Sequence, residues 1–587
     1  MKIFGINFDT HDSSVALIED GDILFAAAEE RYSRVKMDDA FPALALRECL
    51  RQTGTTPEEI DIVAVSGFEP PKNWYYYAKS ALQTKRFTKG KTLFSYERHF
   101  GQKKLVLKGV PALLSNAAFC TGLPQFLLLY MVNRLRLEYL MNGFKGRIVY
   151  ASHHDCHVAT ACFTSGFDEA LSLVTEGYDW ECSFVLDDYE RGNFRSLAKT
   201  YWPHSPGAFY RLVTTILGFD YLRHAGKITG LAAYGNPKAV YQKVSDLLWV
   251  DGLTLKSSPL TYTLNQEYLF TGKLPGYFEG YSMEDIAAAF QRRLEEVTVE
   301  IVQKALSITG KKNVVLSGGV AGNVLMNQRI HNIEAVKGIY IHPAMSDSGQ
   351  SLGAALYAYG EELNNQGCYV PSKKLEHVYL GSGYSDADLE SAIHEAGLCY
   401  CYFKDVENEI AQLLADKKVV ARFNGRMEYG PRTLGNRSIL FHAGDRTAND
   451  WLNKRLGRTE FMPFAPSVLM EDRNDYFHHV NGAKYTAEFM TITFNCTEKM
   501  IRECPAVVHI DGTARPNFVR EEANWSYYKI IKEYKRLTGI GVILNTSFNM
   551  HEEPIVCSPN DAIRAFQRGH LDYLAMGNCL VKNEGVS

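Results

Sequence analysis

Two histidines four residues apart, His153 and His157, begin a helix-like stretch that follows an apolar run at 147–152. Spacing of i and i+4 puts two imidazoles on one helical face, as a metal ion needs. A helix start after a strand also gathers backbone N–H donors and the positive end of the helix dipole, which favours a phosphate or other anion. The pair therefore suggests a metal beside phosphate chemistry. The alternative is two structural histidines, and the rest of the chain must decide.

The composition is that of a large globular protein, with 587 residues, 46% hydrophobic and 22% charged, and a net charge of -4. This length exceeds what one hydrophobic core supports, so we expect at least two domains. The charge balance gives no drive toward nucleic acid or anionic membrane. Twelve cysteines without a CxxC pair favour reduced thiols and a cytoplasmic location. The N-terminus predicts a strand rather than a signal peptide, and no apolar run approaches the roughly 20 residues of a membrane span.

The pattern of strand, polar turn and strand occurs twice in the first half of the chain. The two polar turns lie at 10–14 and 176–179. The strands around them are expected at 3–8, 15–19, 23–28, 170–175 and 183–186. Two such units predict a duplicated α/β architecture in which both turns face a nucleotide across a cleft.

A further strand is expected at 313–317, and it leads into Gly318, Gly319 and a helix that opens at Asn323. Glycines at a strand-to-helix turn allow the backbone to approach a phosphate or nucleoside closely. The alternative is a tight turn kept small for packing alone. We take the three residues as candidates for nucleotide binding.

Asp347 stands just before a small-residue helix expected at 351–359, beside the same cleft. After this helix the sequence becomes polar and loop-like, so we place a domain boundary near residue 365. The predicted domains are 1–365 and 366–587.

An inserted segment is expected at about 70–145. Its part at 74–108 interleaves aromatic and basic residues, a pattern that could bind nucleic acid or an anionic substrate. We favour a solvated helical insertion, because the chain as a whole is not basic.

The second half of the chain contains a second candidate anion site. A strand expected at 419–423 leads into a loop with Arg426, Arg432 and Arg437. Guanidinium groups bind phosphate through paired hydrogen bonds, and the alternative is a charged surface loop. Further polar candidates follow at later turns and strand ends: Arg455, Arg458, Arg515, Asn545 and Ser547. Together they predict a second nucleotide or phosphate site.

These motifs, in this order along nearly the whole chain, resemble the O-carbamoyltransferases of nodulation-factor and antibiotic tailoring. Each motif alone is weak, but the ordered set is specific. The motifs are His11-Asp12-Ser13-Ser14, Glu29-Glu30-Arg31, His153-His154-x-x-His157, Gly226-Lys227-x-x-Gly230-Leu-Ala-Ala-Tyr234-Gly235, Gly318-Gly319-Val-Ala-x-Asn323, Asp347-Ser-Gly349, Gly425-Arg426-Met-Glu428-x-Gly-Pro-Arg432-x-Leu-Gly-Asn-Arg437-Ser438, Pro463-Phe-Ala-Pro466, Asp511-Gly-Thr-Ala-Arg515 and Leu544-Asn545-Thr-Ser547-Phe-Asn549.

The resemblance implies an N-terminal domain of the actin and sugar-kinase (ASKHA) type and a C-terminal α+β domain that is YrdC-like. In that family the YrdC-like site converts carbamoyl phosphate and Mg-ATP to carbamoyl adenylate. The N-terminal site then moves the carbamoyl group to a hydroxyl of an acceptor. A natural product or a glycan is the expected acceptor here.

The resemblance also assigns roles to residues of this chain. His153, His157 and Asp347 would hold a metal, Fe(II) first and Zn(II) or Mn(II) as alternatives, and these ligand types suit all three ions. His11 would act as general base or orient the acceptor, as a neutral imidazole can. Lys227 and Arg515 are the other expected catalytic residues. The expected nucleotide and carbamoyl phosphate ligands are Gly318, Gly319, Asn323, Arg432, Arg437, Arg458, Asn545 and Ser547.

Two departures from the family pattern stand out. Relatives carry Asp-Gly-x-Gly-Glu at the second polar turn, whereas this chain has Glu176 and a turn that is one residue shorter, so whether Glu176 takes the role of that Asp stays open. Leu456 and Met462 stand where relatives have phosphate-contacting Lys and Arg. Either Arg455 or Arg458 compensates, or carbamoyl phosphate is bound differently.

Three alternatives remain at this stage. A small-molecule kinase of the ASKHA type would explain the N-terminal motifs but not the arginine loop. A nucleotide-dependent binding protein or chaperone would not need a metal pair. A tRNA-modifying transferase is favoured only by the kinship of both domains and by segment 74–108, so nucleic acid is disfavoured as a partner. The oligomeric state is open, with a homodimer as one option.

Overall fold

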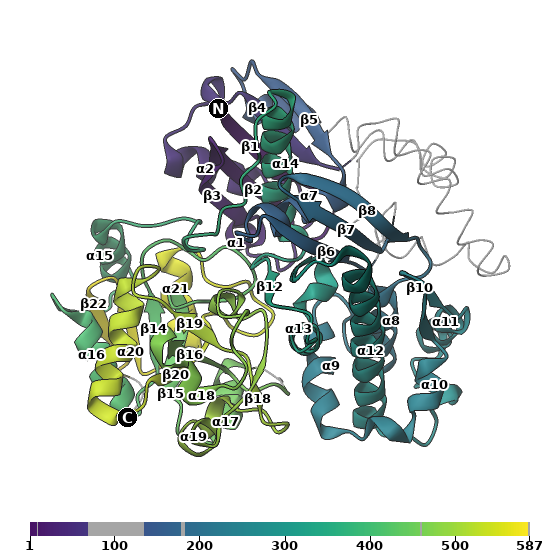
Figure 1. Cartoon of the computed structure of the whole chain (residues 1–587). Coiled ribbons are helices and arrows are strands. Elements are labelled where there is room, and N and C mark those ends of the chain that lie inside the picture. The colour runs from purple at the N-terminus through teal and green to yellow at the C-terminus, as the bar shows by residue number, and fades with distance from the viewer. Residues whose placement is uncertain (9, 68–133, 178–181, 458–460, 585–587) are drawn as a thin grey trace, which may run out of the picture.

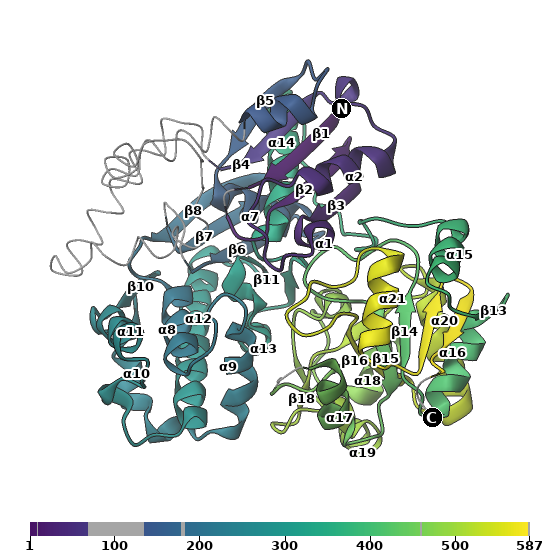
Figure 2. The ribbon, with the colours of Figure 1, turned by 180° about the vertical axis from the view of Figure 1, so that it is seen from behind.

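The computed structural model describes residues 1–8, 10–67, 134–177, 182–457 and 461–584. The first half forms an upper sheet region and a helical region below it, and the second half forms a separate lobe beside the helical region (Figures 1 and 2). Most of the inserted segment expected at 70–145 lies outside the described residues. Among the described helices, none is both long enough and apolar enough to cross a bilayer.

The first half contains two five-stranded sheets with the same strand order. The first sheet runs β3-β2-β1-β4-β5 and the second runs β8-β7-β6-β11-β12. In each sheet the central hairpin is antiparallel and the last two strands are parallel to its first strand. The strands are β1 (Lys2–Asn7), β2 (Ser14–Glu19), β3 (Asp22–Ala28), β4 (Ile62–Ser66), β5 (Arg147–Ala151), β6 (Glu169–Thr175), β7 (Phe184–Glu190), β8 (Asn193–Thr200), β11 (Asn313–Ser317) and β12 (Gly338–Ile341). This repetition confirms the predicted duplicated fold of the actin and sugar-kinase type.

Helices cover both repeats and form the helical region. The longest, α12 (Met283–Thr309), begins where Ser282 accepts a hydrogen bond from the backbone N–H of Asp285 and ends at Gly310 in the left-handed conformation, which are ordinary helix start and stop signals. Other described helices of this half are α1 (Glu30–Ser33), α2 (Ala43–Thr53), α7 (His153–Phe163), α8 (Pro206–Ile216), α9 (Ala225–Leu231), α10 (Tyr241–Ser245), α11 (Leu260–Thr271), α13 (Val324–His331) and α14 (Gln350–Asn365). A small hairpin of β9 (Leu248–Asp251) and β10 (Thr254–Ser257) joins them.

Helix α14 packs against both β1 and α7 at very short range. A Cβ added to Gly5 on β1 would lie 1.9 Å from the Ser351 carbonyl oxygen, and one added to Gly353 would lie 2.2 Å from the Cys156 carbonyl oxygen. Only glycine therefore fits at these two contacts. The close approach brings the start of α14, and Asp347 just before it, up to the start of α7.

The second half is an α+β lobe built on one mixed sheet of order β13-β22-β21-β14-β15-β20-β16-β19. Helices α16 and α20 cover one face of this sheet with an apolar cluster that includes Ile410, Ile531 and Tyr534. The main elements are α15 (Asp386–Glu395), β13 (Tyr400–Tyr402), α16 (Val406–Ala415), β14 (Val420–Phe423), β15 (Arg437–His442), α17 (Ala448–Leu456), β16 (Ala465–Leu469), α18 (Arg473–Tyr476), β17 (Phe494–Asn495), α19 (Glu498–Glu503), β18 (Thr513–Ala514), β19 (Asn517–Val519), α20 (Trp525–Thr538), β20 (Val542–Ser547), α21 (Pro559–Arg568), β21 (Tyr573–Met576) and β22 (Cys579–Lys582). Helix α14 ends at Asn365, beside the predicted domain boundary, and β14 lies close to the strand expected at 419–423.

The close contact between α7 and α14 leads to a testable prediction about the free energy of unfolding. We expect Gly353→Ala to lower the free energy of unfolding by about 1–3 kcal/mol, because the added methyl overlaps the Cys156 carbonyl and the helices must separate. Gly276→Ala is the matched control, since the nearest atom to an added Cβ there is 3.9 Å away. Urea unfolding of both variants measures the difference, and equal stabilities would contradict the packing described here.

Candidate functional site

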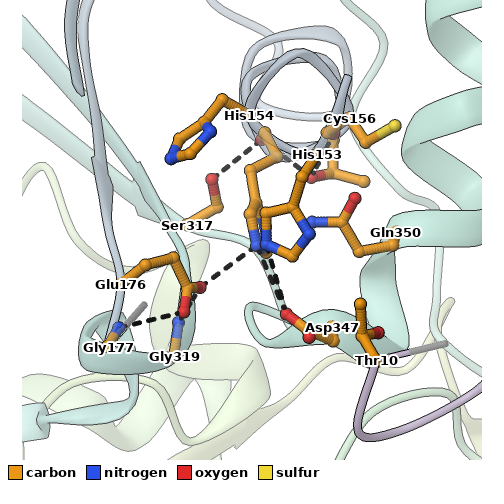
Figure 3. A network of polar contacts seen from close by, with 12 residues as sticks. Thr10, His153, His154, Cys156, Glu176, Gly177, Ser317, Gly319, Asp347 and Gln350 are labelled. Atoms are coloured by element: carbon orange, nitrogen blue, oxygen red, sulfur yellow. Dashed lines mark hydrogen bonds and ion pairs between the residues drawn. The ribbon is translucent and has the colours of Figure 1, made fainter. Parts of the chain in front are cut away.

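Helix α7 begins directly at the histidine pair because Ser152 caps it. The Ser152 side chain accepts a hydrogen bond of 3.1 Å from the backbone N–H of Asp155. His153 and His157 then lie on one face, with ring centroids 4.8 Å apart, and both are buried. Ser317 of β11 donates a 2.8 Å hydrogen bond to the His157 carbonyl, which ties the helix to the second sheet. His154 turns away from this face (Figure 3) and lies 3.4 Å from the Cys182 sulfur.

Two carboxylates meet the histidine pair from other parts of the chain (Figure 3). The Asp347 Oδ1 lies 3.5 Å from the His153 Nε2 and 3.6 Å from the His157 Nε2. The Glu176 Oε1 lies 3.1 Å from the His157 Nε2. One donor atom from each of the four residues falls within 4.8 Å of the others, and all four residues are buried. The structure thus joins the three predicted ligands and adds Glu176, whose role the sequence left open.

The chemistry of this donor set fits a metal ion. The His157 Nε2 and the Asp347 Oδ1 have no hydrogen-bond partner of suitable geometry, although buried polar atoms are nearly always satisfied. Two imidazoles and two carboxylates suit Fe(II), Zn(II) or Mn(II). Burial alone would raise the pKa of Asp347, but His11, His153 and His157 hold it below its ordinary value. The carboxylate is therefore ionised and ready to bind a cation.

His11 lies at the open side of the four-residue cluster. Its Nδ1 is 3.2 Å from the Asp12 Oδ2 and its Nε2 is 3.7 Å from the Asp347 Oδ2. The side chain is 34% exposed, whereas that of Asp347 is 5% exposed. Asp12 adopts the left-handed conformation (φ 65°), which aspartate tolerates better than most residues. His11 can therefore contact both the cluster and a molecule that enters from solvent.

Gly318 and Gly319 form the turn against which the Glu176 carboxylate lies. Gly318 has φ 94°, and a Cβ there would lie 2.3 Å from the Thr175 carbonyl oxygen. The backbone N–H of Gly319 donates to the Glu176 Oε1. The sequence predicted that these glycines approach a nucleotide, and that contact stays a prediction. In the structure they contact Glu176.

Asn323 has two structural contacts that the sequence did not reveal. Its side-chain oxygen accepts from the backbone N–H of Met326 and so caps α13. Its amide and that of Gln291 exchange hydrogen bonds of 2.9 and 3.0 Å. The predicted contact with nucleotide stays a prediction.

The arginine loop at 424–438 is held from within by Glu428 and Arg437. The Glu428 Oε1 accepts from the backbone N–H groups of Leu434, Asn436 and Arg437. The Arg437 guanidinium donates to the carbonyls of Asn424 and Gly425 at 2.7 and 3.1 Å and stacks 3.7 Å above the Phe423 ring.

Arg437 was expected to contact phosphate, and that contact stays a prediction. Its side chain is completely buried, and its guanidinium fixes the shape of the loop by donating to backbone carbonyls. Arg426 is engaged in a similar way, with the carbonyls of Gly381 and Leu24. Arg432 is partly buried, and its predicted contact with phosphate stays a prediction.

Strand β20 brings Asn545 to the arginine loop. The Asn545 side-chain nitrogen donates to the Thr433 carbonyl and to the Ser467 hydroxyl, both at 3.1 Å. Ser547 pairs with Ser438 across the neighbouring strand. Arg515 follows β18 and is partly buried, and Arg458 lies outside the described residues.

Lys227 lies on α9, where the two halves of the chain touch. The residue is buried, and its Nζ is 5.9 Å from the centre of the Phe219 ring, which in turn meets Phe461 of the second half. A Cβ added to Gly230 on the same helix would lie 2.8 Å from the Met462 backbone nitrogen. The position of Lys227 thus differs from that of the metal-ligand cluster, and its predicted catalytic role stays a prediction.

The contact between Glu176 and the turn at Gly318 and Gly319 leads to a prediction about metal binding. We expect Gly318→Ala to weaken divalent metal binding by about tenfold or more, because the methyl overlaps the Thr175 carbonyl and displaces the carboxylate of Glu176. Gly322→Ala in the same turn is the control, since nothing lies within 4 Å of an added Cβ. Metal titration of both variants gives the answer, and unchanged affinity in Gly318→Ala would show that Glu176 does not contribute.

Comparisons with known proteins agree with the ordered motifs. A family model described as the carbamoyltransferase N-terminus matches residues 2–356, and one described as the carbamoyltransferase C-terminus matches residues 411–583. The nodulation protein NolNO of Sinorhizobium fredii is 30% identical over 98% of this chain and 80% of its own length. An uncharacterised protein of Synechocystis is 30% identical over 98% of this chain and 96% of its own length.

A more distant relative and a solved structure extend the comparison. Nodulation protein U of Sinorhizobium fredii is 27% identical over 94% of each chain. The match to component A of the (R)-2-hydroxyglutaryl-CoA dehydratase of Acidaminococcus fermentans covers 62% of this chain and 98% of that one, with 16% identity and a TM-score of 0.33. The two family models and the relatives together show that the chain belongs to the carbamoyltransferase family and is a transferase.

Proposed function

We propose that the chain is an ATP-dependent O-carbamoyltransferase with two reaction sites. In the first step carbamoyl phosphate loses its phosphate to water, and the carbamate displaces pyrophosphate from Mg-ATP to give carbamoyl adenylate. In the second step an acceptor hydroxyl attacks the carbamoyl carbon and AMP leaves. The buried cluster of His153, His157, Glu176 and Asp347, with His11 at its open side, is the observation that carries this proposal.

The first step is assigned to the YrdC-like second half. Both substrates are anions, and arginines stabilise phosphate charge by paired hydrogen bonds without acting as bases. Arg432 and Arg515 are partly buried, while Glu428 and Arg437 hold the loop around Arg432. Asn545 lies against Thr433, next to Arg432. We also assign Ser547 and Arg458 to this site, on the strength of the family motif.

The second step is assigned to the duplicated first half. Burial alone would lower the pKa of His11, but the charge of Asp347 and the contact with Asp12 raise it to about 10. His11 would therefore accept the proton of the acceptor hydroxyl only when a cation held at the cluster lowers this pKa, and its contact with Asp12 orients the ring for this task. His153, His157, Asp347 and Glu176 would hold Fe(II). A bound ion of this kind polarises carbonyl and phosphoryl oxygens. Gly318, Gly319, Asn323 and Lys227 remain candidates for contact with the nucleotide part of the donor.

The acceptor is proposed to be a hydroxyl of a natural product or glycan. Relatives are called nodulation proteins, and this supports a small-molecule acceptor more than a nucleic acid. We propose a cytoplasmic enzyme, since its substrates carbamoyl phosphate and ATP are cytoplasmic metabolites.

The products distinguish this proposal from its main alternative. We expect the purified protein with carbamoyl phosphate and ATP to release one phosphate and one pyrophosphate for each carbamoyl adenylate formed, because the α-phosphate of ATP is the site of attack. AMP should follow as this adenylate is hydrolysed or its carbamoyl group is transferred to an acceptor. Chromatography of the nucleotides measures this. Turnover that yields ADP alone would refute the carbamoyltransferase mechanism and favour a kinase, which the duplicated fold could also support.

The two sites are predicted to be separable by substitution. His153→Ala should lower carbamoyl transfer by about a hundredfold or more, because a metal ligand is lost, while carbamoyl-adenylate formation persists. Arg515→Ala should lower adenylate formation by about a hundredfold while supplied carbamoyl adenylate is still used. Half-reaction assays with labelled carbamoyl phosphate test both, and variants that lose the two activities equally would count against two sites.

A further inference from the structure

A short segment within the arginine loop, residues 426–430, contacts the first half of the chain. The backbone N–H of Met427 donates to the Ser382 carbonyl at 3.0 Å, and that of Tyr429 donates to the Val378 carbonyl at 2.7 Å. The Gly430 carbonyl accepts a 2.7 Å hydrogen bond from Arg31 of α1. This connecting segment is therefore fixed on both sides and reaches across the boundary between the halves.

On its far side the connecting segment contacts the turn that carries Asp347. Tyr429 is buried, and its hydroxyl donates a 2.9 Å hydrogen bond to the carbonyl of Ser348, the residue after Asp347. The Tyr429 ring meets the buried His342 ring with centroids 6.1 Å apart. A Cβ added to Gly430 would lie 2.8 Å from the Pro343 carbonyl oxygen. The segment thus contacts the loop 342–349 at His342, Pro343 and Ser348.

The turn at Asp347 has one further tether of the same kind. Asn7 at the end of β1 donates a 3.0 Å hydrogen bond to the Asp347 carbonyl. Two successive carbonyls, those of Asp347 and Ser348, are therefore held by side chains from opposite halves of the chain. These tethers fix the backbone from which the Asp347 side chain projects, and so restrict where its carboxylate can lie.

On its near side the connecting segment is joined to the rest of the arginine loop through Glu428. The two neighbouring side chains make different contacts: Glu428 accepts from the backbone of the loop, while the Tyr429 hydroxyl donates to the Ser348 carbonyl. The Glu428 carboxylate gathers three backbone N–H groups of the arginine loop. A shift of the loop that moves Glu428 would therefore also move Tyr429, because the two residues are adjacent in the chain.

We propose that Tyr429, in the second half of the chain, is a positioning residue for the metal ligand Asp347 in the first half. The inference deepens the proposed function, since it rests on a metal held by the four-residue cluster. Tyr429 touches no substrate in this account and acts only through the Ser348 carbonyl. Groups outside the ligand set that orient ligands commonly change metal affinity.

The chain offers a matched control in Tyr379. Its hydroxyl also donates to a backbone carbonyl, that of Leu434 in the arginine loop, at 2.8 Å. Loss of either hydroxyl removes one hydrogen bond between a tyrosine and a carbonyl, so the costs to global stability should be similar. Tyr429 holds the turn at Asp347, whereas Tyr379 holds the arginine loop. An effect on metal affinity in the Tyr429 variant alone would therefore reflect the position of Asp347 and not a general loss of stability.

The test compares Tyr429→Phe, Tyr379→Phe and the unchanged protein by anaerobic titration with Fe(II) and by thermal unfolding. Tyr429→Phe should bind Fe(II) about three- to tenfold more weakly and lose carbamoyl transfer from supplied carbamoyl adenylate, with the KM for carbamoyl phosphate unchanged. Tyr379→Phe should keep the Fe(II) affinity and raise that KM. Both should show a similar fall in Tm.

Two results would overturn the inference, and they are distinguishable. Equal Fe(II) affinity in Tyr429→Phe and the unchanged protein, or an equal loss in both variants, would show that Tyr429 has no specific effect on Asp347 while leaving the metal centre intact. Failure of the unchanged protein to bind Fe(II) would overturn the metal centre of the proposed function, and the inference with it.

Discussion

The burial of two carboxylates against two imidazoles is the interaction on which the rest of this structure depends. Charges removed from water are costly unless opposite charges or a cation compensate them. Burial alone would lower the pKa of His157, but Asp347 and Glu176 raise it above its ordinary value. A divalent ion would displace these protons and meet the same charges. The four residues come from α7, from the turn after β6 and from the turn before α14, so the duplicated sheets must pack as they do for the cluster to exist.

The contact between the two halves depends on arginines that donate to backbone carbonyls. Arg31 bonds the Gly430 carbonyl, and Arg34 bonds the carbonyls of Pro554 and Ile555. On the other side of the contact, Glu552 accepts from His224 at 2.8 Å and from Arg223 at 3.1 Å. The pKa of Glu552 is lowered to about 2: burial opposes this shift, and hydrogen bonds from His224 and Arg223 and the nearby charge of Lys36 favour it. The Glu29-Glu30-Arg31 motif therefore contributes to joining the halves.

Local patterns in the sequence predicted much of the fold. Alternation of apolar runs and polar turns located most strands of both repeats, and the spacing of His153 and His157 alone identified one face of α7. Asp347 entered the predicted site through its place at a helix start and through the family resemblance. These features are visible because each depends on neighbours within a few residues.

The remainder depends on contacts between distant segments, which a single sequence does not display. Glu176 joins the cluster because its carboxylate lies against the turn at Gly318 and Gly319, more than 140 residues further along the chain. Arg432 and Arg437 are indistinguishable by composition, yet Arg437 is enclosed while Arg432 is only partly buried. Tyr429 carries no motif of its own, and only its hydrogen bond to Ser348 draws attention to it.

X-ray absorption at the iron edge of the Fe(II)-loaded chain tests the central claim most directly. Two histidine ligands produce multiple scattering from imidazole rings, and His157→Ala should reduce this signal while carboxylate oxygens remain in the first coordination shell. One iron per chain with two imidazole ligands is the result that our account predicts. An absence of bound iron, or an all-oxygen shell that His157→Ala leaves unchanged, would contradict it.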